Sequence, residues 1–184
     1  IIGDGASVTI ENNNIHSNTN AGVFVNGEGS EAVLKDNRIR DGKGGVGICA
    51  GASVTLDNNN IHSNTEAGVF VHGEGSEAVL RDNRIHDVKG GVGICAGASA
   101  TLENNNIHSN TLVGVAVQDE GSKAVLRGNR IHDGKKGGVD ISAGASATLE
   151  NNTITDNDLT AVQLQVHATA TLTGNTIKGN GQCK

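Results

Sequence analysis

Apolar and polar residues alternate along the chain in short stretches, and the same stretches return about every 23 residues. One copy holds Val-Thr-Leu at 54–56, a single apolar Ile61, and Gly-Val-Phe-Val at 68–71. Alternation with a period of two is typical of half-buried β-strands, and the Gly, Asn, Asp and Ser residues between the stretches indicate turns. The pattern therefore predicts many short strands joined by tight turns.

A longer repeat contains this pattern. The tripeptide Gly-Ala-Ser begins at residues 5, 51, 97 and 144, with spacings of 46, 46 and 47 residues, and each unit divides into two halves. Eight half-units align in columns. The aliphatic column is Ile10, Leu34, Leu56, Leu80, Leu102, Leu126, Leu149 and Leu172. The isoleucine column is Ile15, Ile39, Ile61, Ile85, Ile107, Ile131, Ile154 and Ile177.

A coil of three short strands that stacks on copies of itself is a parallel β-solenoid. We therefore predict an all-β fold of about eight coils with three short parallel sheets, in one domain over residues 1–184. Composition agrees, because the chain has 27 Gly and no Pro, Met, Trp or Tyr. Glycine and asparagine disfavour a helical bundle, and no apolar run approaches the ~20 residues of a transmembrane helix.

An asparagine occupies one position in every coil. Stacked side-chain amides can each bond the amide above and the amide below, so the column predicts a buried asparagine ladder. The residue before each is Asn, Asp or Gly, which tolerate the left-handed backbone of a sharp bend. The predicted ladder is Asn13, Asn37, Asn59, Asn83, Asn105, Asn129, Asn152 and Asn175.

A column of alternating charge fixes the predicted register. In parallel in-register strands these side chains are direct neighbours, and opposite charges there favour pairing. We interpret the column as specifying register and not as a binding site. It reads Glu11, Lys35, Asp57, Arg81, Glu103, Arg127 and Glu150.

Phrases such as NNNIHSNTEAGVFV and DNRIHDVKGGVGI resemble the right-handed parallel β-helix repeats of the pectin-lyase-like superfamily. That superfamily includes alginate epimerases and polysaccharide lyases. The repeats look most like the β-helix region of F-box substrate receptors, which is taken to bind substrate proteins. The resemblance covers nearly the whole chain and implies a right-handed wind. No F-box segment is present in the sequence, so ligase activity is not implied.

The two ends lack a capping helix in the sequence. Aligned by 46 residues, Ile2 falls on Ile48, so the chain starts partway through a coil. We expect a fragment of a longer protein, with end-to-end self-association of bare coils as the alternative. No signal peptide or disulfide framework is visible, which leaves the compartment unknown and weakly favours the cytoplasm.

Enzymes of this fold usually place acids and bases on the outward side of the Gly-Val-x-Val sheet. Only one carboxylate, Asp140, falls in the outward columns. Glycosidases and lyases need paired acid and base groups or a carboxylate cluster that holds calcium. The sequence therefore leans against catalysis, and no cofactor is predicted.

Three residues on that sheet suggest metal chemistry at first sight. Cys49 and Cys95 lie two coils apart with His72 between them. Two coils span ~10 Å, too far for a disulfide, and the short ~2.0–2.3 Å bonds of zinc make sharing one ion difficult. We predict no metal site.

The residues after the isoleucine column form a second ladder. Stacked imidazoles ~4.8 Å apart would repel when protonated, which lowers their pKa. Asp41, Asp87 and Asp133 follow on alternate coils and could hydrogen-bond these rings. We expect a solvated stacking ladder, with a ligand surface or adventitious metal capture as alternatives. The histidines of this ladder are His16, His62, His86, His108 and His132.

Phe24 and Phe70 are the only aromatic residues besides histidine, and both should point outward from the Gly-Val-x-Val sheet next to glycines. Either the glycines leave a shallow apolar groove that could take a sugar ring or a peptide side chain, or each ring covers the neighbouring glycine. The candidate binding residues are therefore Phe24, Phe70, His72 and the histidine ladder.

The leading prediction is a non-catalytic scaffold that presents one long face to a protein partner. The alternatives are a carbohydrate-binding or carbohydrate-processing protein, with a polysaccharide as ligand, and a structural solenoid that assembles end to end. A net charge of −6 and a pI of about 5.6 argue against a nucleic-acid partner, and nothing indicates a membrane.

Overall fold

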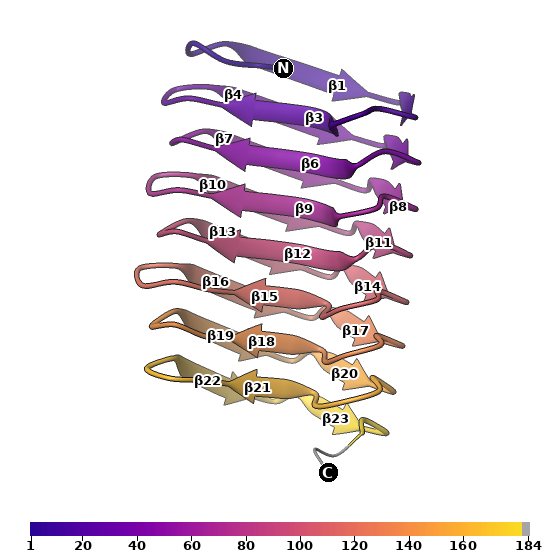
Figure 1. The fold of residues 1–184 in the computed structure, drawn as a ribbon, viewed down its shortest axis with the longest axis vertical. Coiled ribbons are helices and arrows are strands. Elements are labelled where there is room, and N and C mark those ends of the chain that lie inside the picture. Colours follow the sequence, from indigo (N-terminus) through magenta and orange to yellow (C-terminus); the bar gives the residue numbers. More distant parts are fainter. Residues whose placement is uncertain (182–184) are drawn as a thin grey trace.

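The computed structural model describes residues 1–181, and this part of the chain folds as a stack of coils built from 23 strands (Figure 1). The strands form three parallel sheets with eight, eight and seven members, which confirms the predicted all-β solenoid. The third sheet has seven strands, so the chain completes about seven turns. Within the described residues no helix could cross a membrane.

The first sheet contains the aliphatic column. Its strands, in spatial order, are β1 (Ser7–Glu11), β4 (Glu31–Lys35), β7 (Ser53–Asp57), β10 (Glu77–Arg81), β13 (Ser99–Glu103), β16 (Lys123–Arg127), β19 (Ser146–Glu150) and β22 (Thr169–Thr173).

The second sheet contains the isoleucine column. Its strands are β2 (Asn14–His16), β5 (Arg38–Arg40), β8 (Asn60–His62), β11 (Arg84–His86), β14 (Asn106–His108), β17 (Arg130–His132), β20 (Thr153–Thr155) and β23 (Thr176–Lys178).

The third sheet contains the Gly-Val-x-Val stretches. Its strands are β3 (Ala21–Asn26), β6 (Gly44–Cys49), β9 (Ala67–His72), β12 (Gly90–Cys95), β15 (Val115–Val117), β18 (Val139–Ile141) and β21 (Val162–Leu164). Ile2 forms an isolated parallel bridge with Val25, so it takes the place of one more strand, as the 46-residue alignment predicts.

The register is the one that the columns predict. Leu80 pairs with Leu56 and with Leu102, so equal positions of successive coils lie directly over one another. In the charge column Arg81 Nε lies 3.1 Å from Glu103 Oε2, and Arg127 Nε lies 2.8 Å from Glu150 Oε2. These contacts confirm that the alternating charges are cross-strand neighbours.

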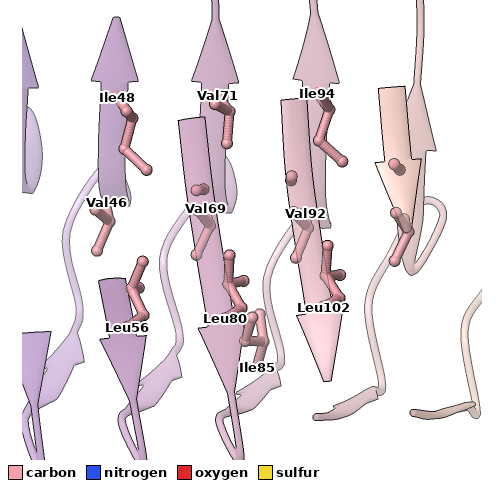
Figure 2. Close-up of a cluster of buried hydrophobic side chains, with 14 of the residues drawn as sticks. Val46, Ile48, Leu56, Val69, Val71, Leu80, Ile85, Val92, Ile94 and Leu102 are labelled. Atoms are coloured by element: carbon pink, nitrogen blue, oxygen red, sulfur yellow. The ribbon is translucent and has the colours of Figure 1, made fainter. Parts of the chain in front are cut away.

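The interior is filled by aliphatic side chains from all three sheets. Figure 2 shows Ile48, Val71 and Ile94 of the third sheet in one row, with Leu80 of the first sheet below them. These four side chains are at most 1% exposed. Because each coil contributes the same residue types at the same places, the core continues from coil to coil without a break.

The asparagine ladder is present and closes the corner between the first two sheets. The Asn59 amide nitrogen Nδ2 donates to Asn83 Oδ1 over 3.0 Å, and the same oxygen accepts the Asn59 backbone N–H over 2.8 Å. Asn83 Nδ2 also donates to the carbonyl oxygen of Leu56. Each buried amide therefore satisfies backbone groups of the bend as well as its neighbour, which gives the column its physical reason.

The residue before each ladder asparagine has a left-handed backbone, as predicted. Asn58, Asp82 and Asn104 have φ of 52°, 54° and 57°, and Gly128 has φ of 64°. Asn and Asp are the non-glycine residues that accept this conformation most readily, and this explains why only Asn, Asp and Gly occur at the bend.

Candidate functional site

The outward side of the third sheet carries the two phenylalanines on alternate coils. Phe24 pairs with Gly47 in the next coil, and a Cβ placed on Gly47 would lie 2.7 Å from Phe24 Cδ2. The same arrangement recurs at Phe70 and Gly93, where the corresponding distance is 3.2 Å. The rings therefore lie over the glycines, and Gly47 is buried whereas Gly93 is half-buried. Phe70 nevertheless stays 41% exposed.

His72 stacks on Phe70, with ring centroids 5.8 Å apart and planes at 27°. It lies between Cys49 and Cys95 in register, as the sequence predicts. Burial raises the pKa of both thiols, and Asp119 adds to this effect at Cys95. Both thiols therefore carry less thiolate than a free cysteine. No three His, Cys, Asp or Glu side chains among residues 1–181 are placed to hold a metal ion, and Cys183 lies outside the described residues.

Asp140 is the carboxylate of the outward columns of the third sheet. Its two oxygens accept hydrogen bonds of 2.9 and 3.2 Å from Gln165 Nε2 in the next coil. Its in-register neighbours on β15 and β21 are Ala116 and Gln163. The geometry thus gives Asp140 an amide partner, and neither of its in-register neighbours is an acid or a base.

The outward side of the second sheet is a strip of side chains that runs along the stack, and we call it the histidine face. Two side chains of each coil project from it, one on either side of the inward isoleucine. The first row reads Asn14, Arg38, Asn60, Arg84, Asn106, Arg130, Thr153 and Thr176. The second row reads His16, Arg40, His62, His86, His108, His132, Thr155 and Lys178.

Four histidines of the second row form one continuous stack. The ring centroids of His62 and His86 are 5.0 Å apart, those of His86 and His108 are 4.8 Å apart, and those of His108 and His132 are 5.0 Å apart. The planes of successive rings differ by 10°, 2° and 14°. The predicted stacking is therefore present for four of the five histidines, and His16 is not part of the stack. The prediction of a solvated ladder is wrong for these four rings, because His62 is buried and the other three are half-buried.

Two of these rings are held in a neutral form. His62 Nε2 accepts a hydrogen bond from Arg38 Nε over 3.0 Å, and His108 Nε2 accepts one from Arg84 Nε over 3.1 Å. A ring nitrogen that accepts from a guanidinium carries no proton. Burial, followed by the neighbouring His86, lowers the pKa of His62, and burial together with His86 and His132 lowers the pKa of His108 to about 4.

The two alternate rings have acceptors on both sides. His86 Nδ1 lies 2.7 Å from Asp87 Oδ2, and His86 Nε2 lies 3.0 Å from Asn60 Oδ1. His132 repeats this pattern with Asp133 and Asn106, at 2.6 and 2.9 Å. The stack therefore alternates between rings that accept a hydrogen bond from an arginine and rings that contact an aspartate and an asparagine.

Some of these partners were not expected from the sequence. The aspartates were predicted as hydrogen-bond partners of the ladder, but the amides of Asn60 and Asn106 and the guanidinium groups of Arg38 and Arg84 were not. Each of these four residues reaches a histidine one coil away. The signal was present, because Arg and Asn alternate at this position with the same two-coil period.

A second set of buried asparagines was also missed. Asn64, Asn110 and Asn157 are at most 3% exposed, and their Oδ1 atoms accept backbone N–H groups of the preceding coil. The Ser-Asn pair after His62 and His108 repeats at 46 residues and could have revealed two of them. These amides fix the loop that leads from the histidine face to the third sheet.

The last coil exposes apolar side chains of the core columns. Leu164, Leu172 and Ile177 are 49%, 44% and 48% exposed. Their counterparts in the preceding coil, Ile141, Leu149 and Ile154, are fully covered. End-to-end association stays a prediction.

Comparisons with known proteins agree with the geometry. The family model of the right handed beta helix region matches residues 1–122 and 95–183. Among solved structures, the chain is similar to the periplasmic alginate epimerase AlgG, with 15% identity and a TM-score of 0.75 over 89% of this chain and 48% of that one. It is also similar to the A-module of the Azotobacter vinelandii mannuronan C-5 epimerase AlgE4, with 18% identity and a TM-score of 0.74 over 97% and 56%.

At these identities the similarity concerns the fold alone, and the chain spans about half the length of the structures it matches. A search of the curated proteins found no match. The resemblance of the repeats to F-box substrate receptors stays a prediction.

Proposed function

Because the chain belongs to the family of the right handed beta helix region, we propose that it is a rigid, non-catalytic scaffold that presents one long face to a protein partner. The observation that carries the proposal is the histidine face. Its side chains are fixed by ring stacking and by hydrogen bonds between coils before any partner arrives. Side chains that are already ordered lose less entropy on binding, so a strip of fixed side chains suits recognition.

The outward columns of the third sheet support a non-catalytic role. Their carboxylate, Asp140, is bonded to an amide and has no acid or base as an in-register neighbour. The stacked pair of Phe70 and His72 could add an aromatic contact on that side of the molecule.

The test is affinity capture with the whole chain and two matched variants. Arg84 belongs to the histidine face, whereas Arg81 lies three residues earlier on the first sheet and is paired with Glu103. We expect a protein captured by the wild type to be lost with Arg84→Gln and kept with Arg81→Gln, and the purified partner to bind directly with the same ranking. If the captured protein is lost with Phe70→Ala and kept with Arg84→Gln, the partner binds the third sheet instead.

Carbohydrate processing is the second candidate, favoured by the fold similarity to two alginate epimerases. Incubation of the chain with alginate, followed by NMR of the sugar anomeric protons, tests it. We expect an unchanged spectrum. Conversion that disappears in Asp140→Asn would replace the scaffold proposal with an enzymatic one.

A further inference from the structure

Three arginines on the histidine face have no acidic partner. Arg38, Arg84 and Arg130 are exposed, and no carboxylate of residues 1–181 lies within salt-bridge distance of them. On the first sheet, in contrast, Arg81 and Arg127 are each paired with a glutamate of the next coil. Arg81 and Arg127 of the first sheet are therefore neutralised by glutamates, whereas Arg38, Arg84 and Arg130 of the second sheet have no ion-pair partner among the described residues.

Three aspartates that directly follow the second row of the histidine face, Asp41, Asp87 and Asp133, are paired with groups other than these arginines. Asp87 and Asp133 contact the Nδ1 atoms of His86 and His132. These atoms lie on the far side of the rings from the first row, which contains the three arginines and is called the arginine row below. Asp41 pairs with Arg40 of its own coil. Neither row of the histidine face contains an acidic residue. The arginine row thus keeps its positive charge although the whole chain carries a net charge of −6.

Two of the arginines are also held in place. Arg38 and Arg84 each donate their Nε–H to the Nε2 atom of a histidine in the next coil. This bond fixes the guanidinium plane through one nitrogen and leaves the two terminal nitrogens for another acceptor. A guanidinium fixed in this way is oriented to form a bidentate pair of hydrogen bonds with a carboxylate. In the coil after Arg130 the equivalent histidine position is occupied by Thr155.

The spacing of the arginines selects the shape of the ligand. They lie on the alternate strands β5, β11 and β17 of one in-register sheet (β11 and β17 are labelled in Figure 1), so neighbours are separated by two strand spacings, ~9.6 Å. A polyproline II chain rises ~3.1 Å per residue with three residues per turn, so every third side chain faces the same way ~9.3 Å apart. A β-strand presents same-side residues only every ~6.7 Å, which does not match.

From this match we propose that Arg38, Arg84 and Arg130 form a binding site for an acidic peptide in the polyproline II conformation, which runs along the stack with a carboxylate at every third residue. The proposal rests on the scaffold function proposed above and names its partner class. The histidine face suits a peptide, because an extended chain needs no cleft to lie across successive coils.

The experiment measures binding of two synthetic peptides with equal charge, by fluorescence anisotropy at low salt. One has four Glu-Pro-Pro units, and the other has four glutamates separated by three prolines. We expect the wild type to bind the first peptide at least threefold more tightly, and to lose affinity as salt is added. Arg84→Gln should weaken binding about fivefold, as one exposed ion pair contributes up to ~1 kcal/mol.

Arg81→Gln should leave the affinity unchanged, and Arg130→Gln, which breaks no bond to a histidine, gives a second variant should Arg84→Gln unfold. Equal binding of both peptides, or binding that survives Arg84→Gln and Arg130→Gln, would overturn the proposal. So would tighter binding of an alginate oligomer that these variants abolish, because the site would then belong to a polysaccharide. If neither polymer binds but a protein is still captured through Arg84, only the peptide proposal fails.

Discussion

At the scale of single residues, His108 shows how the position of a histidine in the stack determines which charged groups surround its ring. Its neighbours are His86 and His132 above and below, Arg84 at Nε2 and Ser109 at Nδ1. Three of these can be positively charged, and with burial they disfavour a proton on His108. The nearby Asp87 opposes this effect without reversing it.

This environment makes stability depend on pH. The pKa of His108 falls from 6.5 to about 4 on folding, so protons bind the unfolded chain more readily. The contribution of this residue to stability is therefore fully present above pH 6.5 and is lost as the pH falls toward 4. Over this pH range, the urea concentration at the midpoint of unfolding should fall less in His108→Gln than in the wild type. His16→Gln, at the exposed end of the row, is the control, and its midpoint should fall with pH as steeply as that of the wild type. An equally steep fall in the wild type and in His108→Gln would contradict the account.

Glycine at the start of the third-sheet stretch is required by close packing. A Cβ on Gly68 would lie 2.5 Å from Ile85 Cγ2 and 2.9 Å from the carbonyl oxygen of Gly91, whereas a Cβ on Gly90 would meet nothing within 4 Å. Gly68→Ala should lower the free energy of unfolding by about 1–3 kcal/mol, as overpacking does. Gly90→Ala should change it by less than ~0.5 kcal/mol. Chemical denaturation of both variants measures these changes. Similar losses of unfolding free energy in Gly68→Ala and Gly90→Ala would argue against the close packing at Gly68.

At the scale of structural elements, the asparagine ladder holds the corner between the first two sheets. Asn105 donates to Asn129 and to the Leu80 carbonyl and accepts from Asn83. Asn105→Ala would leave buried backbone groups without partners, at ~1–3 kcal/mol for each group, so we expect a loss of at least ~2 kcal/mol in urea denaturation. Asn104→Gly is the matched control, because φ of 57° suits glycine, and it should stay close to the wild type. A loss in Asn104→Gly as large as in Asn105→Ala would refute the ladder's role.

The sequence predicts these elements well because each structural position is repeated. The column of Asn59 and Asn83 shows the ladder, and Asn58 before it shows the left-handed bend. A column does not say toward which neighbouring coil a side chain leans. For this reason the hydrogen bond from Arg38 to His62 and the cover of Gly47 by Phe24 are visible only in the structure.

At the scale of the whole molecule, the fold is a one-dimensional stack in which each coil contacts its neighbours. The alternating charge column gives this stack a two-coil period. Removing residues 51–96 would place Lys35 beside Glu103, whereas removing residues 77–98 would place Asp57 beside Glu103.

Both deletions should fold, since each rejoins the chain at an equivalent position. Only the second creates a like-charge pair, which costs ~0.2–1 kcal/mol and is screened by salt. We therefore expect added salt to stabilise the second deletion more than the first in urea denaturation. An equal response to salt would show that the charges do not specify register.

The most direct test of the account is NMR of the isoleucine methyl groups, because each coil places one isoleucine under the next. Ile39, Ile61, Ile85, Ile107 and Ile131 pair in register along the second sheet. With these methyl groups labelled, we predict nuclear Overhauser contacts between consecutive members of the column, such as Ile61 with Ile85 and Ile85 with Ile107. Contacts that skip a coil, or the absence of contacts between Ile61 and Ile85, would contradict the stack on which the proposed binding faces depend.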